Sequence, residues 1–204
     1  MSPKAPEPLK QRIKDQMRSE VVEITIGLFL DRGFDETTVD EICTAAGISR
    51  RTFFRYFRGK EDVVVSRLSK LAEEGCHCFV DCPLDEDRWT ALRMSMTPFE
   101  SWAHENPARA LALFHLIEDA PSLRASYLDR LDRWRASLAT VISTKFDLDS
   151  RSDLDVAVIA AASVGAYLAA TRAWAESGGN DFLPVLFDRA FNALRPEAPQ
   201  LGGR

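Results

Sequence analysis

The chain has 204 residues, enough for one sizeable domain or for a small module joined to a larger one. Hydrophobic residues make up 46% and charged residues 28%, which is typical of a soluble globular protein. No apolar run reaches the roughly 18 residues needed to cross a bilayer. The first 14 residues are polar and proline-rich and lack the apolar core of a secretion signal. We therefore expect a cytoplasmic protein with no membrane partner.

The net charge of −5 argues at first sight against a nucleic-acid partner. The charge is unevenly distributed, however, because residues 1–60 carry 11 lysines and arginines against 9 acids, whereas residues 61–204 carry 15 against 22. Residues 49–60 contain five basic side chains and no acid. A local basic stripe decides phosphate binding more than the total charge does, so nucleic-acid binding stays open.

Helical periodicity runs through almost the whole chain, and no segment alternates like a strand, which predicts an all-α fold. Residues 1–15, with three prolines, are expected to form a flexible arm. A first helix is predicted over residues 16–32, where Gly33 ends it as a left-handed cap.

The next two helices are short. The sequence from Thr38 to Glu41 is a capping box, which predicts a helix start at Thr38, and Gly47 ends that helix. Ser49 is a good N-cap for a third helix that is over by Gly59. A fourth helix is expected over residues 60–80.

Longer helices are predicted over residues 86–104, 107–118, 122–146, 152–177 and 181–194. The expected organisation is an arm (1–15), a small domain that contains the short helices (16–62), a larger helical domain (63–195) and a tail (196–204).

The two short helices around Gly47 form a helix–turn–helix unit, in which the second helix can enter the major groove of DNA. Phe53 and Phe57 are four residues apart and would hold that helix against the core. The opposite face is predicted to contact bases, because arginine reads guanine and an aromatic ring packs on thymine methyl groups. Its members are Arg50, Arg51, Phe54 and Arg55.

Residues 37–42, 45–49, 52–57 and 59–62 also resemble the signature of the TetR family of bacterial regulators. The resemblance covers about a quarter of the chain. It implies a homodimer of nine-helix subunits with a divergent C-terminal effector domain. By position, it implies phosphate contacts from Thr38, Thr52, Tyr56 and Lys60. The chain departs from the family at Phe54, where tyrosine is usual, so an apolar base contact is the safer expectation there.

Bulky apolar residues at helical spacing continue through the larger domain and could surround a ligand cavity. Plain core packing is the simpler interpretation for any single member, so the membership of the pocket stays open. The candidate pocket residues are Trp89, Met94, Phe99, Trp102, Phe114, His115, Glu118, Trp134 and Tyr167.

The effector itself is less defined. Residues 112–142 are similar to an actinobacterial TetR subgroup associated with acyl-CoA-type ligands, although a drug-like or steroid-like molecule would also suit the composition. The last two helices are apolar around much of their circumference and are expected to form a two-fold dimer interface, or else to be buried in their own subunit. The proposed interface residues are Ala161, Val164, Leu168, Phe187 and Phe191.

Other functions have less support in the sequence. An enzyme built on a helical bundle would need converging catalytic groups, but the chain has three histidines and no recognised metal, phosphate or dinucleotide motif, so no catalytic residue, cofactor or metal is expected. A DNA-binding protein without an effector is a further alternative. Cys76, Cys78 and Cys82 do not have the spacing of a structural zinc site, and reduced thiols packed as small apolar groups are the simpler interpretation.

Overall fold

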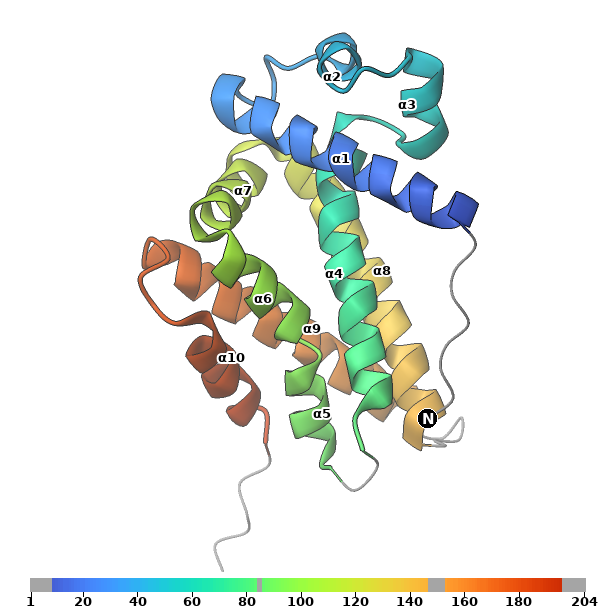
Figure 1. Ribbon diagram of the computed structural model, residues 1–204. Helices are drawn as coiled ribbons and strands as arrows, with labels where there is room; N and C mark the ends of the chain where they lie inside the picture. The colour runs from blue at the N-terminus through green and yellow to red at the C-terminus, as the bar shows by residue number, and fades with distance from the viewer. Residues whose placement is uncertain (1–8, 84–85, 147–152, 196–204) are drawn as a thin grey trace, which may run out of the picture. The chain divides into compact units, whose positions relative to one another are not determined.

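The computed structural model describes residues 9–83, 86–146 and 153–195. Every regular element in these ranges is a helix, as the all-α prediction requires (Figure 1). The helices are α1 (Leu9–Arg32), α2 (Val39–Ala45), α3 (Arg50–Tyr56), α4 (Lys60–Asp81), α5 (Arg88–Met94), α6 (Thr97–Glu105), α7 (Pro107–Asp119), α8 (Pro121–Phe146), α9 (Asp153–Glu176) and α10 (Leu183–Asn192).

The described residues contain ten helices rather than nine because the single helix expected over residues 86–104 is two. The hydroxyl of Ser95 donates to the carbonyl of Leu92, which closes the last turn of α5. Pro98 follows in the first turn of α6, where a proline is tolerated because that backbone N–H has no helical partner. The proline therefore starts a new helix instead of continuing the old one.

The chain divides into two compact units, and the first comprises residues up to 68 together with 116–127. Its core is built from side chains that α1 to α4 bury, among them Ile26, Ile42 and Val63, each at most 1% exposed. The rings of Phe29 and Phe34 lie 4.9 Å apart across the end of α1. Gly33 stands between them with φ +91°, which confirms the left-handed cap.

Helix α1 begins at Leu9, seven residues before the predicted start. Its buried side chains begin only at Val21, so the periodicity that marks a helix on its buried face is missing from the first turns. Residues 9–15, which were expected to be the last part of the flexible arm, therefore belong to α1.

The second unit comprises residues 69–115 and 128 onwards. An aromatic cluster from four helices forms much of its core: Phe99 (α6) lies 5.6 Å from Trp134 (α8) and 4.7 Å from Tyr167 (α9), and Tyr167 stacks at 6.1 Å on Phe187 (α10). All four are less than 7% exposed. Helices α9 and α10 pack against each other in this unit (Figure 1).

Helix α9 is long and apolar enough to span a membrane by length and composition, but half of its most apolar window is buried inside the protein. The buried residues include Ser163 and Thr171, whose hydroxyls donate to carbonyls one turn earlier in the same helix. A core helix of a soluble protein has the same properties, so α9 gives only weak evidence of a membrane segment.

Candidate nucleic-acid interface

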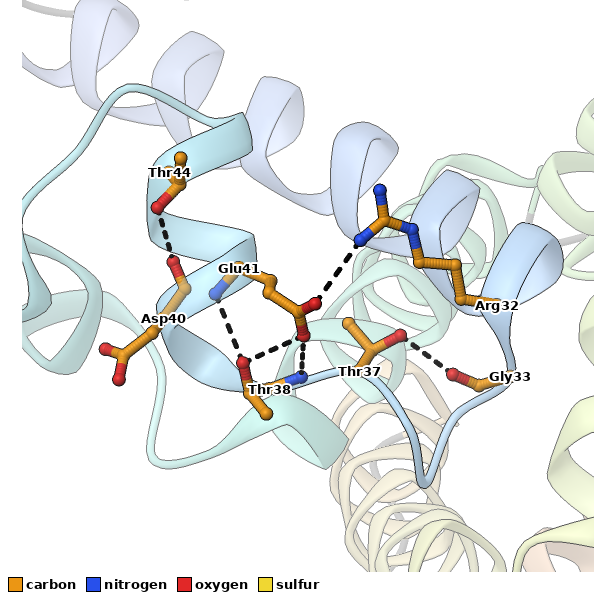
Figure 2. A network of polar contacts seen from close by, with 7 residues as sticks. All are labelled: Arg32, Gly33, Thr37, Thr38, Asp40, Glu41 and Thr44. Atoms are coloured by element: carbon orange, nitrogen blue, oxygen red, sulfur yellow. Dashed lines mark hydrogen bonds and ion pairs between the residues drawn. The ribbon is translucent and has the colours of Figure 1, made fainter.

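The start of α2 is held by the capping box that the sequence predicted (Figure 2). The backbone N–H of Thr38 donates to Oε2 of Glu41 at 2.8 Å, and the N–H of Glu41 donates to the Thr38 hydroxyl oxygen at 3.3 Å. Two backbone groups that a helix start leaves unpaired are thereby satisfied. The beginning of the helix–turn–helix unit is fixed by its own side chains.

The Glu41 carboxylate also joins α2 to α1, since Oε1 lies 3.3 Å from the guanidinium of Arg32 (Figure 2). The hydrogen bond from the Thr38 backbone, followed by that from its hydroxyl, lowers the pKa of Glu41 below its ordinary value. The Thr38 hydroxyl donates its proton to Glu41 at 2.9 Å. To donate to a DNA phosphate, as the resemblance implies, Thr38 would have to redirect this bond.

The turn between α2 and α3 is a Schellman motif centred on Gly47. The N–H of Ile48 donates to the carbonyl of Cys43 at 3.0 Å, and that of Gly47 to the carbonyl of Thr44 at 3.2 Å. Gly47 has φ +63°, a conformation that side chains with a Cβ rarely adopt. The glycine thus allows the sharp change of direction between the two short helices.

Helix α3 starts where the sequence predicts, with the Ser49 hydroxyl accepting the N–H of Thr52 at 3.1 Å. Phe53 and Phe57 are 0% and 2% exposed and their rings lie 5.4 Å apart. Phe54, one position along the helix, is 50% exposed. Phe53 and Phe57 are therefore buried on one face of the helix, and Phe54 is exposed on the other.

The exposed face of α3 carries the four residues that were predicted to contact bases. Arg50 is held by an ion pair of 3.0 Å to Asp40 of α2, and its guanidinium lies 5.9 Å from the Phe54 ring. Arg55 donates to the Tyr56 hydroxyl at 2.9 Å. Arg51 is exposed next to them. The structure thus brings the predicted base-contacting residues together on one surface.

Lys60 lies at the start of α4 and binds the loop that precedes α2. Its ammonium donates to the carbonyls of Phe34 and Thr37 at 2.7 and 3.1 Å, and more weakly to that of Asp35 at 3.3 Å. It also lies 4.4 Å from the centre of the Phe34 ring. These bonds use the three donors of a lysine, so a phosphate contact by Lys60 would have to replace one of them.

Two short helices joined by a glycine turn, the second with a buried aromatic face and an exposed basic one, define the helix–turn–helix class of DNA-binding proteins. Residues 22–66 match the model of bacterial regulatory proteins of the tetR family, and residues 86–199 match that of the MftR C-terminal domain. The second match alone spans more than half of the chain. The chain belongs to the TetR family of transcriptional regulators.

Relatives and solved structures agree with this assignment. The chain is 28% identical over 197 residues to the HTH-type transcriptional regulator TcmR of Streptomyces glaucescens, covering 93% of this chain and 87% of TcmR. The fold resembles that of FadR from Bacillus subtilis in complex with stearoyl-CoA (TM-score 0.60, 15% identity, 86% and 96% coverage). It also resembles FadR of Thermus thermophilus in complex with lauroyl-CoA (TM-score 0.56, 23% identity, 91% and 100% coverage).

The structure brings only some of the residues predicted to line a ligand pocket into contact with one another. Phe99, Trp134 and Tyr167 contact one another in the aromatic cluster of the second unit, and Trp102 is buried in that unit at 5% exposure. Trp89 and Phe114 are half-buried, the latter 6.0 Å from Trp174. Met94, His115 and Glu118 are exposed. Three of the seven apolar members thus contact one another, while the two polar members, His115 and Glu118, are at the surface.

Sequence reasoning missed the polar groups that the second unit buries. The indole N–H of Trp134 has no hydrogen-bond partner of ordinary geometry among the described residues. The Cys76 thiol lies near it, and burial raises the pKa of that thiol, so Cys76 stays protonated and is at best a weak acceptor for the indole. Burial likewise raises the pKa of Glu100, which lies 2.7 Å from Arg93. A tryptophan amid apolar residues gives no sequence signal that its N–H will lack a partner.

Proposed function

We propose that the chain is a ligand-responsive regulator, acting as a repressor, that binds a palindromic operator as a homodimer and is released by a small, largely apolar effector. The exposed face of α3, with three arginines and Phe54 opposite its buried phenylalanines, is the observation that carries the proposal. Arginine can donate two parallel hydrogen bonds to guanine in the major groove. Thr52 and Tyr56, both half-buried, would contact the flanking phosphates, with Thr38 and Lys60 where their present bonds allow. Operator binding places this protein in the cytoplasm.

The dimer interface that we propose lies on the outer face of α9. Phe187, Phe191 and Val164 are 0%, 2% and 7% exposed within a single subunit, so they are not free to contact a second one in this conformation. The exposed apolar side chains lie elsewhere on the same two helices. On α9 these residues are spaced alternately by four and three positions, so they share one face: Leu154, Val158, Ala161, Gly165 and the half-buried Leu168. Two more exposed apolar residues, Phe182 and Val185, lie at the start of α10.

This face suits a two-fold contact because its small residues permit close approach of two helices while its larger ones supply apolar area. Leu154 and Val158 are 74% and 57% exposed in the single subunit. Binding to two half-sites of a palindrome would require the two α3 helices of such a dimer to lie about one turn of DNA apart, roughly 34–36 Å.

We propose an acyl-CoA-like molecule as the effector, with its acyl chain among the aromatic side chains of the second unit. The support is the apolar cluster around Trp134 and the fold shared with two FadR proteins that were crystallised with acyl-CoA molecules. Helix α4 contributes residues to both units and is the natural connection between ligand and DNA. A ligand that binds more tightly to a conformation unable to bind DNA would lower the affinity for the operator. The size of this change is the coupling free energy between the two sites, commonly about 1–3 kcal/mol.

The test is selection of bound sequences from random DNA by the full chain, followed by affinity measurements on the selected operator with and without stearoyl-CoA or lauroyl-CoA. Arg51→Ala should lower operator affinity by roughly 5–150-fold, the value of one bidentate base contact, while the dimer persists. Arg88→Ala removes the same charge from an exposed site in the second unit and should have no effect. Unchanged affinity of Arg51→Ala would refute the assignment of α3 as the recognition helix, and operator binding indifferent to both ligands would refute the acyl-CoA effector.

A further inference from the structure

The N-terminal turns of α1 are not explained by packing. The helix begins at Leu9, yet none of the side chains described between residues 9 and 20 is buried. Leu9 and Ile13 are 69% and 59% exposed. Since short helical segments are marginal in water without a packed face, this part of the helix gains little from the core.

The same turns carry a concentrated positive charge. Residues 9–18 contain four basic side chains and one acid, whereas residues 19–32 contain one basic side chain and three acids. The partial charge of a helix is positive at its N-terminus, so cations there are unfavourable for the helix itself. Of the four basic residues, Lys10 and Arg12 lie in the first turn, where this effect acts, and a charge arrangement that opposes the helix dipole there is understandable if the basic residues serve an external anion.

Two of these cations lie against the end of the recognition helix. The ammonium of Lys14 is 5.9 Å from the centre of the Tyr56 ring, and the guanidinium of Arg18 is 5.5 Å from that of Phe57. The N-terminal half of α1 accordingly lies beside α3 (Figure 1). From α3 itself, Arg55 covers the Tyr56 ring at 4.7 Å.

Tyr56 provides a hydrogen-bond donor among these cations. Its hydroxyl oxygen accepts from Arg55 at 2.9 Å, which leaves the hydroxyl proton available for an acceptor outside the protein. Lys14, Arg18 and Arg55 are all exposed. Lys14 and Arg55 at the Tyr56 ring, with Arg18 at the ring of the next residue, put three exposed cations on the same end of α3 as this hydroxyl proton, an arrangement suited to phosphate oxygens.

We propose that residues 9–18 of α1 are a second DNA-contacting element, in which Lys14 and Arg18 bind backbone phosphates next to the one contacted by Tyr56. This inference rests on the proposed function, because it needs α3 to lie in the major groove. Lysine and arginine on phosphates add affinity and fix orientation without reading sequence. Lys14 and Arg18 therefore strengthen binding to every DNA sequence, whereas the exposed face of α3 distinguishes among them.

The experiment compares the salt dependence of operator binding by the wild-type chain and by Lys14→Ala/Arg18→Ala. Each phosphate contact contributes about 0.9 to the slope of log affinity against log salt concentration, so losing two should reduce the slope by about 1.8. Between 50 and 200 mM salt, the wild type should then lose roughly tenfold more affinity than the variant. The ratio of operator to random-DNA affinity should stay the same. A conservative variant, Lys14→Arg/Arg18→Lys, keeps both charges and should keep the wild-type slope.

The matched control is Lys70→Ala/Arg88→Ala, which removes two charges from exposed sites of the second unit. The inference is overturned if Lys14→Ala/Arg18→Ala retains the wild-type slope with native helical content, or if the control loses as much slope. Wild-type protein that binds no operator would instead overturn the proposed function, and this inference with it.

Discussion

Arg93 is the centre of a partly buried network that joins three helices of the second unit. Its guanidinium lies 2.7 Å from Glu100 of α6 and 2.6 Å from Asp188 of α10, and it donates to the carbonyl of Pro184 at 3.0 Å. It also covers the Phe187 ring at 5.7 Å. The Arg93 and Glu100 side chains are only 18% and 15% exposed, so Arg93→Ala would leave the Glu100 carboxylate without its charge partner in a poorly hydrated site.

The size of the effect follows from the burial of each partner. Removing one partner of a buried ion pair costs about 3–5 kcal/mol, and the residual exposure of this pair favours the lower end. Asp188 is 57% exposed and adds little. We therefore expect Arg93→Ala to lower the free energy of unfolding by about 3 kcal/mol and Tm by roughly 6–12 °C, measured at one protein concentration. Glu100→Gln removes the charge that needs Arg93, so the double variant should lose about 1–3 kcal/mol less than the sum of the single ones.

The stability lost in Arg93→Ala should also depend on pH. Burial raises the pKa of Glu100 above its ordinary value of 4.5, and the charge of Arg93 opposes that rise. A carboxyl whose pKa is raised by folding is protonated more readily in the folded state, so its ionisation destabilises the fold increasingly as pH rises from 4.5 through the raised pKa. Without Arg93 the pKa rises further, and the loss should be larger at pH 7.5 than at pH 5. Equal losses at both pH values, additive with those of Glu100→Gln, would refute this account.

Two further predictions concern the dimer and the packing of α4. Val158→Asp on the outer face of α9 should convert the protein to a 22.9 kDa monomer in light scattering at micromolar concentration. The control Leu128→Asp, at a similarly exposed site on α8, should leave the protein dimeric. A dimeric Val158→Asp would contradict the proposed interface. Gly75→Ala should destabilise the fold by about 1–3 kcal/mol in urea unfolding, because its Cβ would lie 2.3 Å from the backbone carbonyl of Ser95. Gly27→Ala in α1 meets nothing within 4 Å and should stabilise by roughly 0.5–1 kcal/mol, so the same sign for both changes would count against the steric argument.

The features that could be predicted from the sequence are those that depend on neighbours a few residues away. A capping box spans Thr38 to Glu41, and the turn at Gly47 is closed by bonds that reach no further than five residues. The same holds for the alternation of buried Phe53 and exposed Phe54 on α3. These patterns contain both partners of each interaction, so the local sequence is sufficient.

The features that could not be predicted depend on which helices, distant in the sequence, pack against each other in the fold. The apolar face of α10 shows in the sequence, but periodicity does not distinguish burial against α9 of the same subunit from burial against a partner, and Phe187 is fully buried in its own subunit. The Arg93–Asp188 contact joins residues 95 positions apart. The start of α1 at Leu9 was missed because its first turns have no buried face to produce a pattern.

The role of Lys60 shows the same limit within the DNA-binding unit. A lysine at a helix start next to a basic helix suggests a phosphate contact, yet its ammonium reaches back 23 to 26 residues to the carbonyls between α1 and α2. These bonds hold the segment that leads into Thr38, and Thr38 in turn sets the start of α2. A cation with three carbonyl partners supports the local backbone more than it attracts a distant anion. We therefore expect Lys60 to influence DNA binding by positioning α2 against α3, and to contact a phosphate only by giving up one of its carbonyl bonds. Lys14 beside Tyr56 and Arg18 beside Phe57 are both exposed and are placed to meet the phosphates themselves.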